Sequence, residues 1–151
     1  MTESQSIAVD SNVVIAALLS WHQHHEQALR ALQEALNNSA VVPVHVILES
    51  FSVLTRLPSP HRLSAQDAGR LLVNTFRGHA KMIGFGPSDL WQLVDLLVER
   101  DVSGGTTYDG VILQCARRAG ADRLYTFNIR HFSRLDPEGI DIIDPRSCFG
   151  G

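Results

Sequence analysis

Short apolar stretches alternate with longer helical segments along the whole chain, and this alternation limits the possible folds more than any other feature. The apolar stretches are predicted strands and cover residues 7–9, 41–43, 81–85, 123–127 and 140–144. The segments between them predict helices, most of them from apolar residues repeating every three or four positions, at 12–19, 24–37, 44–54, 64–78, 87–98 and 108–119. Such alternation indicates a parallel sheet covered on both faces. We therefore expect an α/β fold, a three-layer sandwich with a central, mostly parallel sheet flanked by helices.

Length and composition indicate one soluble globular domain. The chain has 151 residues, 44% of them hydrophobic and 19% charged, and it contains no internal repeat or linker, so we expect residues 1–151 to form a single domain. No apolar run is long enough to cross a bilayer and no secretory signal is visible, so we expect a cytoplasmic protein without membrane association. The net charge of −3 means that a polyanionic ligand would need a local positive field or bound metal ions.

Three carboxylates stand alone in apolar surroundings. Each is the only formally charged residue in its stretch: Asp10 in 4–25, Glu49 in 41–55 and Asp109 in 102–116. A buried carboxylate is costly unless hydrogen-bond donors, a basic side chain or a metal ion meet it. Each acid follows, or nearly follows, a strand or loop at one edge of the predicted sheet, where parallel strands place their working sites. The three side chains can therefore converge.

Converging carboxylates repel one another and take up protons unless a cation holds them ionised. Hard oxygen ligands without thiolates or clustered imidazoles point to Mg²⁺ or Mn²⁺ rather than zinc. A single acid early in a helix can equally be a cap or a first-turn residue that favours the helix dipole. Taken together, three isolated acids favour a metal cluster over three separate caps.

Other candidate sites are weaker. His22, His24 and His25 resemble a metal-binding tract, but their position at a polar helix start favours a solvated helix end. The chain has no Gly-rich dinucleotide loop, no Walker-type Gly-Lys-Ser/Thr and no Gly-x-Ser-x-Gly elbow. Cys115 lies in an apolar helical stripe and is expected in the core rather than at a reactive centre.

Three motifs together resemble a known family. They are Val9-Asp-Ser-Asn12 before an apolar helix, Glu49 in a helix after Val-Pro, and the segment 108–132, which begins Tyr-Asp-Gly and contains Thr126-Phe-Asn128. In this order and spacing they resemble the PIN-domain nucleases and, more narrowly, the VapC-type ribonuclease toxins of bacterial toxin–antitoxin pairs. The likeness extends over about residues 7–143.

The resemblance implies a Mg²⁺- or Mn²⁺-dependent endoribonuclease that hydrolyses RNA phosphodiester bonds, with Asp10, Glu49 and Asp109 as catalytic metal ligands. Asn128 stands where the family often places a fourth acid, and it joins the catalytic set as a neutral amide that lowers the negative charge of the site. His131 stands where Asp is common and is interpreted as a surface or substrate-side residue. The residues expected to orient ligands or bind substrate are Ser11, Thr107, Thr126 and Arg130.

The resemblance also implies a cognate antitoxin that covers apolar surface and blocks the acidic pocket, and a homodimer. Two alternative functions, each typical of another class of protein, stay open. A PIN fold that has lost cleavage and serves as an RNA- or protein-binding module would fit Asn128 but leaves three isolated acids unexplained. A phospho-acceptor receiver domain would need a second acid beside Asp10 and a late lysine, whereas Ser11 follows Asp10 and Lys81 is the only lysine.

Overall fold

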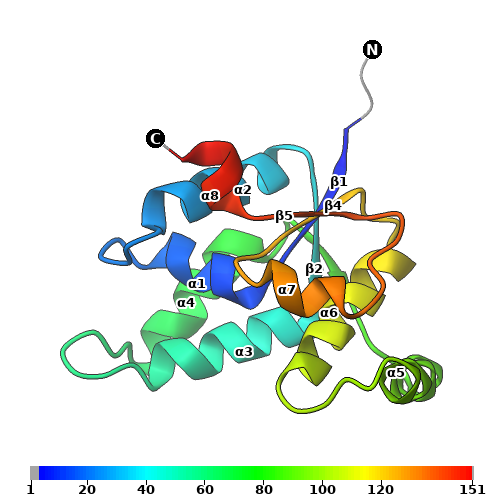
Figure 1. Ribbon diagram of the computed structural model, residues 1–151. Coiled ribbons are helices and arrows are strands. Elements are labelled where there is room, and N and C mark those ends of the chain that lie inside the picture. Colours follow the sequence, from blue (N-terminus) through cyan, green and yellow to red (C-terminus); the bar gives the residue numbers. More distant parts are fainter. Residues whose placement is uncertain (1–3, 151) are drawn as a thin grey trace.

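The computed structural model describes residues 4–150, and its centre is a five-stranded sheet in the order β3-β2-β1-β4-β5. Every neighbouring pair of strands is parallel (Figure 1). The strands are β1 (Ser6–Val9), β2 (Ser39–Pro43), β3 (Lys81–Ile83), β4 (Arg123–Tyr125) and β5 (Asp141–Ile143). The predicted α/β sandwich is confirmed, with a sheet that is wholly rather than mostly parallel.

Helices flank this sheet (Figure 1). They are α1 (Ser11–Leu18), α2 (His25–Asn37), α3 (Val44–Thr55), α4 (Ala65–Phe76), α5 (Pro87–Glu99), α6 (Thr106–Arg118), α7 (Ile129–Ser133) and α8 (Pro145–Phe149). Helix α2 packs against both α1 and α8, and α6 packs against both α5 and α7. Within residues 4–150, none of these helices is both long and apolar enough to cross a membrane.

The position of β1 at the centre of the sheet explains why its sequence is continuously apolar. Ile7, Ala8 and Val9 of β1 are all fully buried, because β1 lies between β2 and β4 and helices cover the sheet. The chain proceeds from β1 through β2 to β3 on one side and then returns to β4 on the other side of β1. The strand order therefore reverses between β1 and β4, and the carboxyl ends of these two strands form the switch point where α/β sheets place their sites.

Several element boundaries differ from the sequence prediction for identifiable reasons. Strand β4 ends at Tyr125 rather than at 127. The Thr126 N–H still donates to the Ile143 carbonyl oxygen of β5, but the Phe127 N–H donates to the side chain of Asn12 instead of to a strand. Helix α6 begins at Thr106, two residues before the predicted start, because the backbone of Gly105 is already helical. Helices α7 and α8 were not anticipated, since five residues are too few to show an apolar period.

Asp89 stabilises the start of α5, and its replacement is expected to be costly. The side chain accepts the Gly86 N–H at 2.8 Å and pairs with Arg118 of α6, while the residue is 6% exposed. We expect Asp89→Ala to lower the free energy of unfolding in urea by about 1–3 kcal/mol. Asp89→Asn keeps the acceptor for Gly86 and should cost clearly less. Equal losses in the two variants would mean that the capping bond contributes little.

Candidate active site

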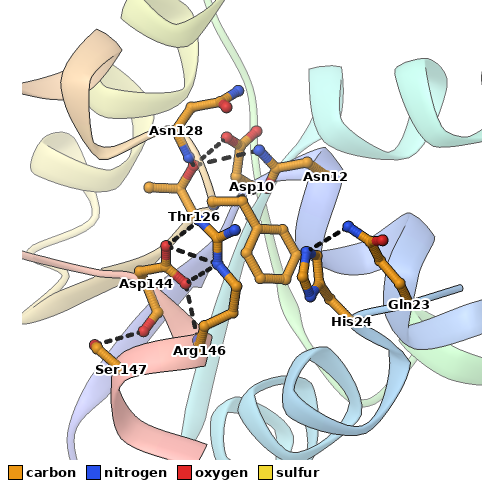
Figure 2. Close-up of polar contacts among 10 residues, drawn as sticks. Asp10, Asn12, Gln23, His24, Thr126, Asn128, Asp144, Arg146 and Ser147 are labelled. Carbon is orange, nitrogen blue, oxygen red and sulfur yellow. Dashed lines mark hydrogen bonds and ion pairs between the residues drawn. The ribbon is translucent and has the colours of Figure 1, made fainter. Parts of the chain in front are cut away.

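Asp10 lies where β1 ends and caps the first turn of α1. The residue is 2% exposed. Its Oδ1 accepts the Ser11 N–H at 2.7 Å and the Ser11 hydroxyl at 3.3 Å, and its Oδ2 accepts the Thr126 hydroxyl at 2.7 Å. Figure 2 shows the carboxylate between the two strand ends, facing Thr126 and Asn12. The neighbouring strands β1 and β4 thus place the acid and its hydroxyl donor together.

The charge of Asp10 is poorly compensated. Its pKa is raised from 3.8 to about 7, chiefly because burial disfavours the ionised form. Repulsion by Asp109 and Glu49 adds to the rise, and the hydrogen bonds from Thr126 and Ser11 oppose it. Within residues 4–150, no Lys, Arg or His nitrogen lies within 4.0 Å of this carboxylate. The carboxylate therefore lacks a cationic partner from the described part of the chain.

The other two isolated acids each have a histidine partner. Asp109, in the first turn of α6, lies 2.8 Å from Nδ1 of His131. Glu49, in α3, lies 3.1 Å from Nε2 of His45 one turn earlier. Burial raises the pKa of Asp109, and the hydrogen bond from His131 opposes that rise. His131 was expected to be a surface or substrate-side residue; it is exposed, and it also contacts an acid of the site.

The three acids act on one another electrostatically. Asp109 and Glu49 both raise the pKa of Asp10, and Glu49 also raises that of Asp109. The described residues nevertheless contain no group of three or more His, Cys, Asp or Glu side chains that could hold a metal ion. The acids therefore do not form a ready-made ligand cage, and metal binding by these residues stays a prediction.

The remaining predicted site residues fall into two groups. Ser11 and Thr126 are 5% and 0% exposed and both donate hydrogen bonds to Asp10, so they are placed to orient that carboxylate rather than to meet substrate. Asn128 and Arg130 are exposed at the start of α7. Thr107 is half-buried in the first turn of α6, near Asp109 in sequence.

Sequence reasoning did not assign a role to Asn12, which links the two strand ends. Its Nδ2 donates to Oγ1 of Thr126 at 3.5 Å (Figure 2). Its Oδ1 accepts the Phe127 N–H at 3.3 Å. A polar residue at the start of an apolar helix, directly after Asp10 and Ser11, was the available signal. His45 was also missed, although its spacing of four residues before Glu49 on one helix predicts contact.

Comparison with known proteins places this site in a family. The PIN domain family model matches residues 7–137. The chain belongs to the PIN-domain family. Ribonuclease VapC40 of Mycobacterium tuberculosis strain CDC 1551 / Oshkosh is 36% identical to this PIN domain over 124 residues, which cover 82% of this chain and 87% of VapC40. The resemblance to VapC-type PIN-domain proteins is therefore confirmed.

Solved structures share the fold of this PIN domain. The crystal structure of Mycobacterium tuberculosis VapC20, described as a sarcin-ricin loop cleaving toxin, matches with a TM-score of 0.69 and 19% identity over 84% of this chain and 93% of that one. VapBC2 from Rickettsia felis, bound to a DNA fragment from its promoter, matches with a TM-score of 0.62 and 17% identity over 93% and 100% of the two chains. At these identities the likeness supports the fold alone.

Proposed function

We propose that this PIN domain is a Mg²⁺- or Mn²⁺-dependent endoribonuclease that hydrolyses RNA phosphodiester bonds as the toxin of a type II toxin–antitoxin system. The observation that carries the proposal is the environment of Asp10: it is buried, its pKa is raised to about 7, and two further acids repel it. A bound divalent cation would relieve this cost and keep the carboxylates ionised. The 36% identity to ribonuclease VapC40 supports the class of reaction.

The donor chemistry fits a hard cation. Asp10, Asp109 and Glu49 offer carboxylate oxygens, and the thiol of Cys115 points elsewhere, 3.7 Å from the carbonyl oxygen of Gly84. Mg²⁺ prefers such oxygens and commonly keeps several water ligands while binding one or two carboxylates. That mode of binding does not require a ready-made group of three protein ligands, and none is found among residues 4–150.

Asp10 and Asp109 would hold the divalent cation, which when bound would supply activation of a water and neutralisation of charge on the phosphate oxygens. Asp10 would hold the ion in an orientation set by the Thr126 hydroxyl and the Ser11 amide. Asp109 would be the second ligand, oriented by its hydrogen bond with His131.

Two further residues would handle the proton and the substrate. Glu49 is the most accessible of the three acids, with a side chain 39% exposed, and would accept the proton of the attacking water. Arg130 is exposed on α7 and would contact the phosphate backbone of the RNA. Asn128, also exposed, would offer its side-chain amide as a hydrogen-bond donor where a fourth acid would repel phosphate.

Thr126→Val tests the orienting role of the hydroxyl. The variant keeps the shape of the side chain but removes the 2.7 Å hydrogen bond that lowers the pKa of Asp10. We expect Mg²⁺ affinity and RNA cleavage to fall by roughly 10- to 100-fold, as for other groups that orient metal ligands. Mg²⁺ titration followed by calorimetry measures the first effect, and Thr75→Val is the matched control, because the Thr75 hydroxyl donates only to the Leu71 carbonyl oxygen within α4. Unchanged Mg²⁺ affinity in Thr126→Val would contradict this role.

The proposal includes a cognate antitoxin, a homodimer and a cytoplasmic location. The similarity of this chain to the VapC-type ribonuclease VapC40 is the basis for expecting an antitoxin partner. We expect expression of the wild-type chain alone to arrest bacterial growth, and co-expression of a small protein encoded beside it to restore growth. The Asp10→Asn variant should be harmless. A wild-type chain that is harmless when expressed alone would count against the toxin role.

One observation favours a second candidate, a PIN fold that binds RNA or protein without cutting. The position that often carries a fourth acid is the neutral and exposed Asn128. Such a module would bind RNA equally well with and without Mg²⁺ or Mn²⁺ and would not cleave it. Cleavage assays over both ions therefore separate the two candidates.

A further inference from the structure

A cavity lies beyond the carboxyl end of β4, and the proposed function uses only part of its lining, including Asn128 and Arg130. Its volume is about 320 Å³, and its lining includes Phe127, Asn128, Arg130, Asp144 and Arg146. These residues come from the segments that follow β4 and β5. The cavity therefore combines an aromatic ring, two arginines and one acid at the same edge of the sheet as the acidic site.

Arg146 is held in a fixed orientation over the ring of Phe127. Its Nε lies 3.0 and 3.1 Å from the two carboxylate oxygens of Asp144, and its Nη2 lies 2.6 Å from Oδ2. Its Cζ lies over the Phe127 ring, 5.3 Å from the centroid. Partial burial favours the neutral form of Asp144, but the hydrogen bonds from Arg146 outweigh it and lower the pKa of the carboxyl. The pair therefore stays ionised and the guanidinium stays in place.

Phe127 is fixed in turn by its neighbours. Its backbone N–H donates to Oδ1 of Asn12, and its ring lies against His24, with the centroids 5.4 Å apart. The preceding residue, Thr126, donates to Asp10 and accepts the N–H of Asn128. The backbone of Phe127 is thus connected to the Asp10 carboxylate by hydrogen bonds through Asn12 and Thr126, and the guanidinium of Arg146 lies over the Phe127 ring.

This arrangement suits a planar ligand more than an anionic one. Asp144 already satisfies much of the hydrogen-bonding and charge of Arg146, so an acidic side chain or a phosphate gains little there. The side chain of Arg146 is nevertheless 47% exposed, and a flat guanidinium is a favoured stacking partner for nucleobases. Arg130 is exposed and has no carboxylate within 4.0 Å among residues 4–150, which suits a phosphate.

We propose that Phe127 and Arg146 form a stacking platform for a base of single-stranded RNA next to the phosphate that is cut at Asp10, while Arg130 contacts the RNA backbone. The inference rests on the proposed function, because it assigns the cavity to the same substrate. It adds that part of the affinity for RNA comes from stacking on a base and not only from charge.

The test compares variants that separate stacking from charge. In an Asp10→Asn background that prevents cleavage, binding of a fluorescently labelled single-stranded RNA of mixed sequence and about 12 nucleotides is followed by anisotropy at several salt concentrations. Arg146→Lys keeps the positive charge but loses the planar group, so we expect affinity to fall about fivefold or more while the salt dependence is unchanged. Arg130→Ala should instead lower the slope of log affinity against log salt by about 1.

The control is Arg70→Ala on α4, an exposed arginine that does not line the cavity; it should bind RNA like the background protein. Phe127→Leu, which keeps an apolar side chain but removes the ring, should weaken binding in the same way as Arg146→Lys. In the protein with an intact Asp10, Arg146→Lys should raise KM and leave kcat nearly unchanged.

Two different failures are distinguishable. If the protein with an intact Asp10 cleaves RNA but Arg146→Lys changes neither the affinity for RNA nor KM, the proposed stacking platform is wrong and the proposed function stands. If that protein does not cleave RNA with any added Mg²⁺ or Mn²⁺, the proposed function is wrong as well. Loss of antitoxin binding in Arg146→Lys with unchanged RNA binding would also overturn the inference, because the platform would then serve a protein partner.

Discussion

Asp10→Asn is expected to reduce RNA cleavage by roughly 10³-fold or more and, at the same time, to stabilise the metal-free protein above pH 7. Activity falls because the proposed site loses its strand-end ligand. Stability rises because the variant removes a buried negative charge that Asp109 and Glu49 repel. Initial rates of RNA cleavage in Mg²⁺ and urea unfolding in chelator measure the two effects on the same preparations.

The opposite directions of the two effects make this variant informative. Asp95→Asn on α5 is the matched control, because it removes the same charge from an exposed position and should alter neither quantity by much. Loss of activity together with loss of stability would indicate that Asp10 is a structural cap. Retained cleavage in a folded Asp10→Asn protein would contradict the proposed mechanism.

Metal-free wild-type protein is expected to lose stability as the pH rises from about 4 to above 7. The pKa of Asp10 is raised from 3.8 to about 7 in the folded state, so within this window the folded protein keeps a proton that the unfolded chain has lost. Folding then becomes less favourable with rising pH, by up to about 4 kcal/mol in total. The pKa of Asp109 is also raised by burial and adds a change of the same sign.

Added Mg²⁺ should reverse this loss, because a bound dication favours the ionised carboxylates, so its stabilising effect should be larger at pH 8 than at pH 5. Burial lowers the pKa of His22 from 6.5, which contributes with the opposite sign below that pH. The difference between the wild type and Asp10→Asn, from urea unfolding at both pH values, isolates the contribution of Asp10. No difference in pH dependence between the two proteins would contradict the assignment.

The general architecture was predictable because its signals are local. Strand β1 could be predicted from its apolar run and the end of β2 from its proline, because both signals lie in neighbouring residues. Asp10 was recognisable for the same reason, as the single charge between two apolar segments. Glu49 and Asp109 stood out in the same way, and the resemblance to a family then implied a catalytic role where isolation in sequence alone leaves a capping role open for each acid.

The contacts that Thr126 makes with Asp10 and His131 makes with Asp109 were not predictable, because they join residues that are distant in sequence. Thr126 donates to Asp10 across 116 positions, a contact that exists only because β4 lies beside β1 in the sheet. The pairing of His131 with Asp109 likewise depends on where the short helix α7 lies relative to α6. Strand order and the docking of a one-turn helix are tertiary properties that no local pattern determines.

Cleavage of a labelled RNA by the purified wild-type chain, first in chelator and then after addition of Mg²⁺ or Mn²⁺, tests most directly whether the acidic site around Asp10 uses a metal to cut RNA. We predict no cleavage in chelator, endonucleolytic cleavage after either ion is restored, and none with either ion in Asp10→Asn. Cleavage that persists in chelator, or that Asp10→Asn performs at the wild-type rate, would contradict the account.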